Sequence, residues 1–185
     1  FINRLRDMFR NYDLCSLIKV NLTDVKETGV ITDQTLLNLL GLTWAASISG
    51  EANACAPEVF SVLHETVHRL PTYAKSIYLE FKPLLSLIES NREALRPISN
   101  YLWRLAEGHV TDFEDYLMNH VGLMIKDPVA AINTAEILAM LAKSKDAGEA
   151  LKMLDMGIRL INELCLTRPS ACNLAKAEAY QSVSE

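Results

Sequence analysis

TDQTLLNLLGLTWAASISG, residues 32–50, is the stretch that decides the fold. It begins with Thr32 and Asp33, whose side chains can accept hydrogen bonds from the free N–H groups of a first helical turn. It ends with Gly50, which suits the left-handed residue that closes a helix. Because apolar side chains lie on most sides between these ends, the stretch predicts a helix buried in the centre of an all-α protein.

Prolines and capping side chains divide the rest of the chain into further helices. We expect them at residues 1–11, 58–70, 72–89, 92–107, 111–124, 127–143 and 146–164, with a short last helix after Pro169. Residues 14–20 form only a short apolar piece, and no stretch alternates as a strand does before a hairpin turn. The expected fold is therefore all-α: one domain over residues 1–185, folded as a compact irregular bundle of about eight or nine helices.

Local signals refine three of these helices. Pro83 lies inside the helix at residues 72–89, so a kink is expected near Phe81. Pro97 is expected to interrupt the helix at residues 92–107. Thr111 and Glu114 have the spacing of a capping box, in which each side chain bonds the backbone N–H of the other residue.

The charge and the length of the apolar runs exclude two classes of partner. The formal net charge is −5, and the basic residues cluster only at Arg4, Arg6 and Arg10, too few to neutralise the phosphates of a nucleic acid. The longest uncharged run, residues 34–50, has 17 residues, whereas a membrane-spanning helix needs about 20. There is no glycine-rich loop to hold a phosphate, and we expect no cofactor.

Four cysteines and one glycosylation triplet favour a secreted protein. Cys165 and Cys172 can close a local loop, which leaves Cys15 and Cys55 as the second pair, one of three possible connectivities. Asn21 begins an Asn-Leu-Thr acceptor triplet for N-glycosylation. Two alternatives remain open: one cysteine bonds another chain, or all four are buried thiols of a cytosolic protein.

His64-Glu65-Thr-Val-His68 spells the zinc-protease motif H-E-x-x-H. Histidines four residues apart lie above one another on a helix and can both bind Zn²⁺, while the glutamate activates a water. A third ligand is required, and Glu89 or Glu93 is a candidate. A zinc metallohydrolase is therefore one alternative function.

The faces of the predicted helix argue against this alternative. At about 100° per residue, the apolar side chains between Val59 and Leu70 form one sector, and the two histidines lie roughly 120° from its centre. They would point largely toward solvent. We therefore expect no catalytic residue and no metal site, and interpret the motif as the outer face of a helix.

Several short stretches resemble the light chain of insect silk fibroin. They are Ser47-Ile48-Ser49-Gly50, Ala54-Cys55-Ala56, the helix start near Val59, Tyr73-Ala74, Phe81-Lys82-Pro83 and Asp112-Phe113-Glu114. The resemblance covers about a third of the chain. It implies a secreted helical protein that is disulfide-bonded to a large fibre-forming chain. The cysteine that such light chains carry just before the Asp-Phe-Glu stretch has no counterpart here, which leaves the linking cysteine open.

The sequence thus predicts a secreted, non-enzymatic, all-α protein that acts as an assembly partner or accessory subunit of a larger extracellular protein. A helical carrier is the main alternative, because a leucine-rich bundle can enclose a cavity for an apolar ligand.

Overall fold

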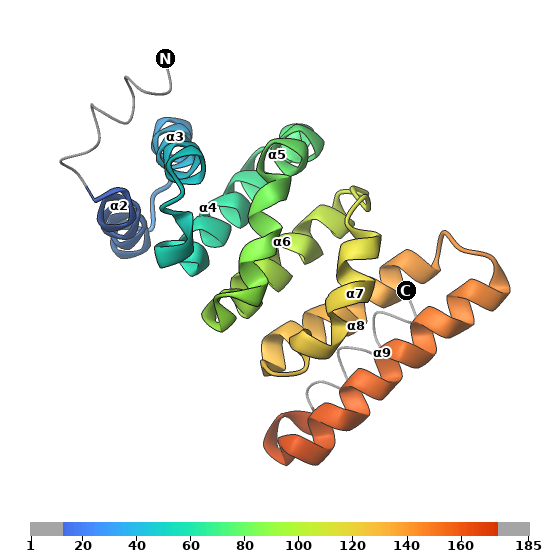
Figure 1. Ribbon diagram of the computed structural model, residues 1–185. Coiled ribbons are helices and arrows are strands. Elements are labelled where there is room, and N and C mark those ends of the chain that lie inside the picture. Colours follow the sequence, from blue (N-terminus) through green and yellow to red (C-terminus); the bar gives the residue numbers. More distant parts are fainter. Residues whose placement is uncertain (1–12, 174–185) are drawn as a thin grey trace. The chain divides into compact units, whose positions relative to one another are not determined.

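The computed structural model describes residues 13–173. The predicted amphipathic helix at residues 1–11, with its arginine cluster, lies outside the described residues. Every regular element between residues 13 and 173 is a helix, which confirms the predicted all-α fold (Figure 1). In chain order the elements are α2 (Leu14–Thr28), α3 (Asp33–Ser49), η1 (Ala52–Cys55), α4 (Ala56–Arg69), η2 (Pro71–Tyr73), α5 (Ala74–Phe81), η3 (Lys82–Glu89), η4 (Arg92–Ala94), α6 (Leu95–Glu107), α7 (Glu114–Met124), α8 (Pro128–Ala142) and α9 (Ala147–Thr167), where η marks a 3-10 helix.

The helices form two compact units, which we describe separately. The first unit ends at Ile98 and the second begins at Ser99, so that the boundary falls inside α6. A single domain over residues 1–185 stays a prediction. Within residues 13–173, no helix combines the length and the apolar character that crossing a membrane requires.

The first unit begins with a helix that the sequence indicated only in part. Residues 14–20 were expected to be a short apolar piece, but α2 continues to Thr28. Asp13 caps its first turn, and Gly29 ends it in the left-handed conformation at φ 66°. Ile18, Leu22 and Val25 follow one another at helical spacing and are buried, so one face of α2 packs on the rest of the unit.

The helix bounds predicted for residues 32–50 are confirmed. The prediction that this helix lies in the centre of the fold is wrong. The backbone N of Thr35 donates to Thr32 Oγ1 over 3.1 Å, and Gly50 ends α3 at φ 78°. Leu36 and Leu39 are buried, yet 55% of Leu37 is exposed. The reason is that α3 packs mainly against α2 and α4. The opposite side of α3 faces solvent, although it too carries apolar side chains.

Two prolines act differently from what the sequence suggested. Pro83 does not kink a continuous helix; α5 ends at Phe81, and the chain continues as the 3-10 helix η3. Pro97 does not interrupt α6, because it lies in the first turn of the helix that begins at Leu95. A proline in a first turn removes no intrahelical hydrogen bond.

In the second unit three of the four predicted helix starts are confirmed, and one of these is the short helix expected after Pro169, since residues 169–173 are helical. Asp127 accepts from Ala130 N at 3.0 Å and begins α8, and Asp146 accepts from Glu149 N at 2.9 Å and begins α9. The capping box at Thr111 is wrong: α7 begins at Glu114, and its cap residue, Phe113, makes no side-chain cap bond. Phe113 is instead fully buried. Its packing therefore outweighs the capping preference of Thr111.

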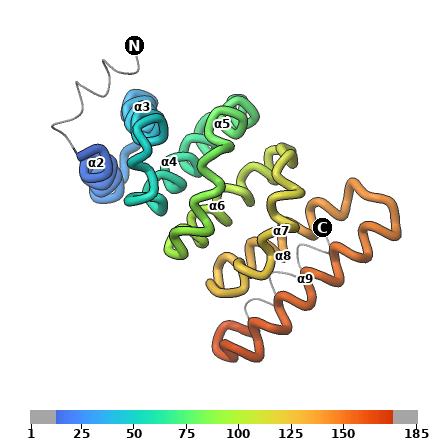
Figure 2. The backbone as a smooth tube through the Cα atoms, in the orientation of Figure 1, coloured from blue at the N-terminus to red at the C-terminus, as the bar shows by residue number. Residues whose placement is uncertain are grey.

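The longest helix pair of the second unit is α8 with α9, which run side by side (Figure 2). Gly157 of α9 lies against Ala135 of α8: a Cβ built on the glycine would be 3.5 Å from the Ala135 carbonyl oxygen. Ile161 and Leu164 continue this contact as part of a buried cluster with Ala131 and Ala135. Small residues thus let the two backbones approach closely.

Candidate functional site

The two histidines of the H-E-x-x-H stretch lie on the outer side of α4. Val59, Leu63 and Val67 are buried, which confirms the predicted apolar face. The His64 side chain is 22% exposed, and His68 is exposed. Their rings stack with centroids 6.4 Å apart. The two histidines therefore border solvent.

Glu65 is more acidic than an ordinary glutamate. Its interaction with the His64 side chain, whose Nδ1 lies 3.8 Å from Glu65 Oε1, lowers the pKa of Glu65, and partial burial opposes this change. Electrostatic interactions with His64, His68 and Arg69 lower the pKa of Glu65 further. A general base works best with a pKa near the working pH. The lowered pKa makes Glu65 a weaker base for activating a water.

A third zinc ligand is missing from the described part of the chain. Within residues 13–173 no three His, Cys, Asp or Glu side chains come together in a group that could hold a metal ion. The candidates Glu89, at the end of η3, and Glu93, in η4, therefore do not join His64 and His68. Two imidazoles alone fall short of the three protein ligands of catalytic zinc sites.

We expect added zinc to leave the thermal unfolding midpoint unchanged, because a two-histidine site has little affinity to add to the folded state. Differential scanning fluorimetry with zinc, and with zinc plus a chelator, measures this. His64→Ala is the matched control and should behave as the wild-type protein does. Stoichiometric zinc binding that is lost in His64→Ala would contradict the expectation.

All four cysteines are paired within the chain. Disulfides join Cys15 to Cys55, with Cα atoms 5.4 Å apart, and Cys165 to Cys172, with Cα atoms 4.5 Å apart. This is the pairing that the sequence favoured. No cysteine remains for a bond to another chain, so the alternative of an interchain disulfide is not supported.

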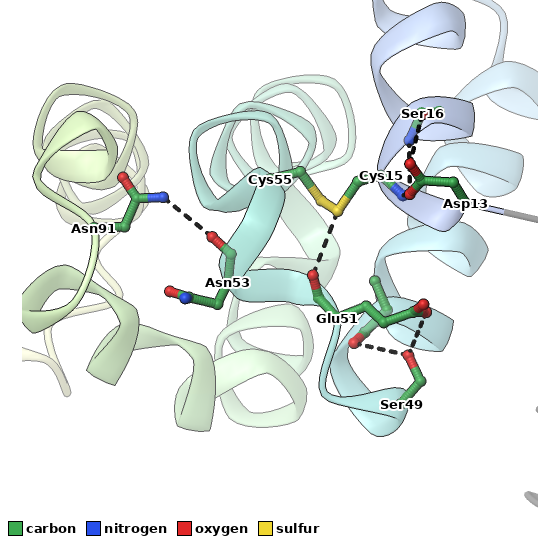
Figure 3. The surroundings of a disulfide bond; sticks show 9 residues. Asp13, Cys15, Ser16, Ser49, Glu51, Asn53, Cys55 and Asn91 are labelled. Atoms are coloured by element: carbon green, nitrogen blue, oxygen red, sulfur yellow. Dashed lines mark hydrogen bonds between the residues drawn. A yellow bond between two sulfur atoms is a disulfide. The ribbon is translucent and has the colours of Figure 1, made fainter.

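The first disulfide lies within a network of polar contacts (Figure 3). It joins the start of α2 to the end of η1. Asn91 Nδ2 donates to the Asn53 carbonyl at 3.1 Å, which ties η1 to the segment before η4. One short 3-10 helix is thus held from both sides.

The glycosylation triplet lies in a helix. Asn21 is half-buried in α2, and its Nδ2 donates to the Leu17 carbonyl at 2.7 Å. Acceptor triplets are expected in surface loops. Glycosylation of Asn21 stays a prediction that rests on the triplet alone.

Residues 33–81 form a candidate binding site, an apolar groove in the first unit with a volume of about 530 Å³. Three segments form it: the outer face of α3, the C-terminal end of α4, and η2 with α5. Thr66, Ile77 and Phe81 form its floor and are buried. Leu40 and Leu70 form its half-buried walls.

The rim of the groove is exposed. Leu37 is 55% and Tyr73 60% exposed, and Asp33, Ser76 and Glu80 complete the rim. Exposed large apolar side chains above a buried apolar floor mark sites where proteins bind partners or ligands. We call this site the α3–α5 groove.

Two side-chain contacts hold the ends of the α3–α5 groove in place. At one end Arg69 Nη2, from the last turn of α4, donates to the Ile31 carbonyl just before α3. At the other end Trp44 Nε1 donates to Glu80 Oε1 at 3.2 Å, joining α3 to α5. These two contacts link α3 to α4 at one end of the groove and to α5 at the other.

The sequence contains the α3 half of this groove as a stripe of residues, but the stripe by itself does not predict a groove. Asp33, Leu37, Leu40 and Trp44 recur at helical spacing along one side of α3. Because α3 is apolar on most sides, this stripe predicts burial rather than a groove. The opposing residues of α4 and α5 lie more than 20 positions away in sequence, so that only the fold brings them to the stripe.

Comparisons of the chain with protein-family models, with curated proteins and with solved structures find no match.

Proposed function

We propose that the chain is a secreted, non-enzymatic accessory protein that binds an extracellular protein partner through the α3–α5 groove. The observation that carries the proposal is the exposed apolar rim of Leu37 and Tyr73 above a buried floor. Such a rim favours association over catalysis because it offers apolar area and no convergent titratable groups. Two disulfides support the secreted part of the proposal, since disulfides persist in oxidising compartments.

The shape of the groove favours a protein over a small ligand. Small-molecule sites bury about 70–90% of their ligand, whereas this groove is open between two helices along its exposed rim. An open apolar groove between helices is one recurring mode of peptide recognition. The volume of about 530 Å³ nevertheless falls in the range of ligand pockets. The carrier of an apolar ligand is therefore the second candidate function.

The accessory role agrees with the role implied by the resemblance to fibroin light chains, with one difference. Those proteins are linked to their partner by a disulfide, but here all four cysteines are used within the chain. The proposed association is therefore non-covalent. The complex should form without an interchain disulfide, and denaturation alone should dissociate it, with no need for a reductant.

Native mass spectrometry of the protein isolated from its own source tests this proposal. We expect the mass of a second polypeptide that denaturation releases without reductant. A lipid mass without a polypeptide supports the carrier instead. A zinc mass, or a polypeptide released only by reductant, contradicts the proposal.

Leu37→Asp should weaken binding of that partner more than tenfold, because burial of a leucine side chain contributes about 1.5–3 kcal/mol and the new carboxylate must be desolvated. Titration calorimetry measures the loss. Leu151→Asp is the matched control, since Leu151 is 67% exposed on α9 and lies outside the groove. Equal affinity of both variants would exclude the groove as the binding site.

A further inference from the structure

The α3–α5 groove has the length of a short helix. On α3 its lining runs from Asp33 to Leu40, which are 7 positions apart. At 1.5 Å per residue this separation is about 10 Å, or two helical turns. Leu37 lies between them on the same side, and Trp44, one turn further along α3, donates to Glu80. A partner helix with about two turns of apolar contact would cover this strip.

The relative direction of helices α3 and α5 follows from the two side-chain contacts at the ends of the groove. Arg69 joins the end of α4 to Ile31, and Tyr73 follows four residues after Arg69. Trp44 joins α3 to Glu80 at the other end. Helices α3 and α5 therefore run in the same direction along the groove, and Asp33 and Glu80 lie at opposite ends of it.

The charge of the groove has one sign. Among the described residues that line it, Asp33 and Glu80 alone are charged, and both are acidic and exposed. Three cations lie near the groove without lining it: Lys75 and Lys82 are close in sequence to its α5 residues, and Arg69 donates to the Ile31 carbonyl at the Asp33 end. One carboxylate therefore stands at each end of an apolar strip, and a positive charge at either end of an occupant would be attracted.

We propose that the α3–α5 groove binds an amphipathic helix of the partner that carries Lys or Arg side chains near both ends of a two-turn apolar stripe. The apolar stripe covers Leu37, Leu40 and the buried floor, and the two basic side chains reach Asp33 and Glu80. The carboxylates discriminate against an acidic helix of the same apolar pattern, because like charges repel at both ends. This inference rests on the proposed binding function and names the chemistry of its partner.

Two synthetic peptides of about 18 residues test the inference. Both carry leucines at helical spacing; one has arginine near each end of the stripe, and the other has glutamate at the same positions. Fluorescence anisotropy with the full chain should show that the arginine peptide binds at least tenfold more tightly at low salt. The ratio should shrink as salt rises, since salt screens exposed charges.

Variants assign the difference to the two carboxylates. In Asp33→Asn with Glu80→Gln the ratio should fall close to one, and Gln at position 80 keeps an oxygen for Trp44 Nε1. Asp24→Asn with Glu27→Gln is the matched control: it removes the same charge from exposed positions of α2 and should preserve the ratio. Circular dichroism of each variant checks that it is folded.

The outcomes separate this inference from the proposed function. Equal affinity for both peptides, abolished by Leu37→Asp, overturns the charge selection and keeps the groove as a protein-binding site. Binding of neither peptide overturns the inference, while a polypeptide mass in the native spectrum would still support the proposed function. Binding of neither peptide together with a lipid mass overturns both and favours the carrier.

Discussion

Replacing Cys15 and Cys55 together by alanine should lower the free energy of unfolding by about 4 kcal/mol. The bond joins residues 40 positions apart, and a crosslink stabilises a protein mainly by restricting its unfolded chain, more so when the closed loop is longer. Both sulfur-bearing side chains are buried, so the folded state also loses packing. Urea unfolding followed by circular dichroism measures the change.

The second disulfide provides the control for this experiment. Cys165 and Cys172 are only 7 positions apart, and the same argument gives about 2 kcal/mol for the pair of alanine substitutions. The first disulfide should therefore contribute clearly more. Equal losses for the two pairs would show that restriction of the unfolded chain does not govern their effect.

Gly157→Leu should lower the free energy of unfolding by about 3 kcal/mol, the upper end of the usual cost of overpacking. A Cβ at this position would already lie 3.5 Å from the Ala135 carbonyl oxygen and 3.7 Å from its Cα, both backbone atoms of α8. The remaining atoms of a leucine would have to displace that backbone. Urea unfolding with a probe of helix content measures the loss.

Two further glycine variants separate crowding from helix preference. Gly157→Ala should stabilise the protein by up to about 1 kcal/mol, because its Cβ makes only ordinary contacts and alanine favours a helix. Gly41→Leu is the matched control on α3, where nothing lies within 4 Å of an added Cβ. A destabilising Gly41→Leu, or a neutral Gly157→Leu, would contradict the role assigned to the contact between α8 and α9.

The helix ends that sequence predicts best are those set by local chemistry. Asp127, Asp146 and Thr32 each accept the backbone hydrogen bond expected of a cap, and these bonds involve residues only three positions away. Thr111 has the same local pattern but no such role, because burial of Phe113 sets the start of α7. Capping preferences of about 1 kcal/mol are smaller than the burial of a phenylalanine.

The position of a helix within the fold is harder to predict than its ends. Apolar residues on most sides of α3 predicted burial on most sides, but neighbours cover mainly one side of it. The number of neighbours that pack on a helix depends on contacts with distant segments. The amino-acid composition of the helix itself does not predict those contacts. The α3–α5 groove exists for this reason, and its floor comes from residues that no spacing rule connects to α3.

The pairing of the cysteines has a consequence for the order in which the chain matures. Each disulfide joins neighbouring cysteines in the sequence and lies within one compact unit. The first bond requires only residues up to Cys55, whereas the two thiols of the second bond lie 110 and 117 residues further along the chain. At roughly 5–20 residues per second, this corresponds to about 5–20 s of synthesis. The first unit can thus be oxidised before the second pair of thiols has been made, which reduces the opportunity for wrong pairings between the two.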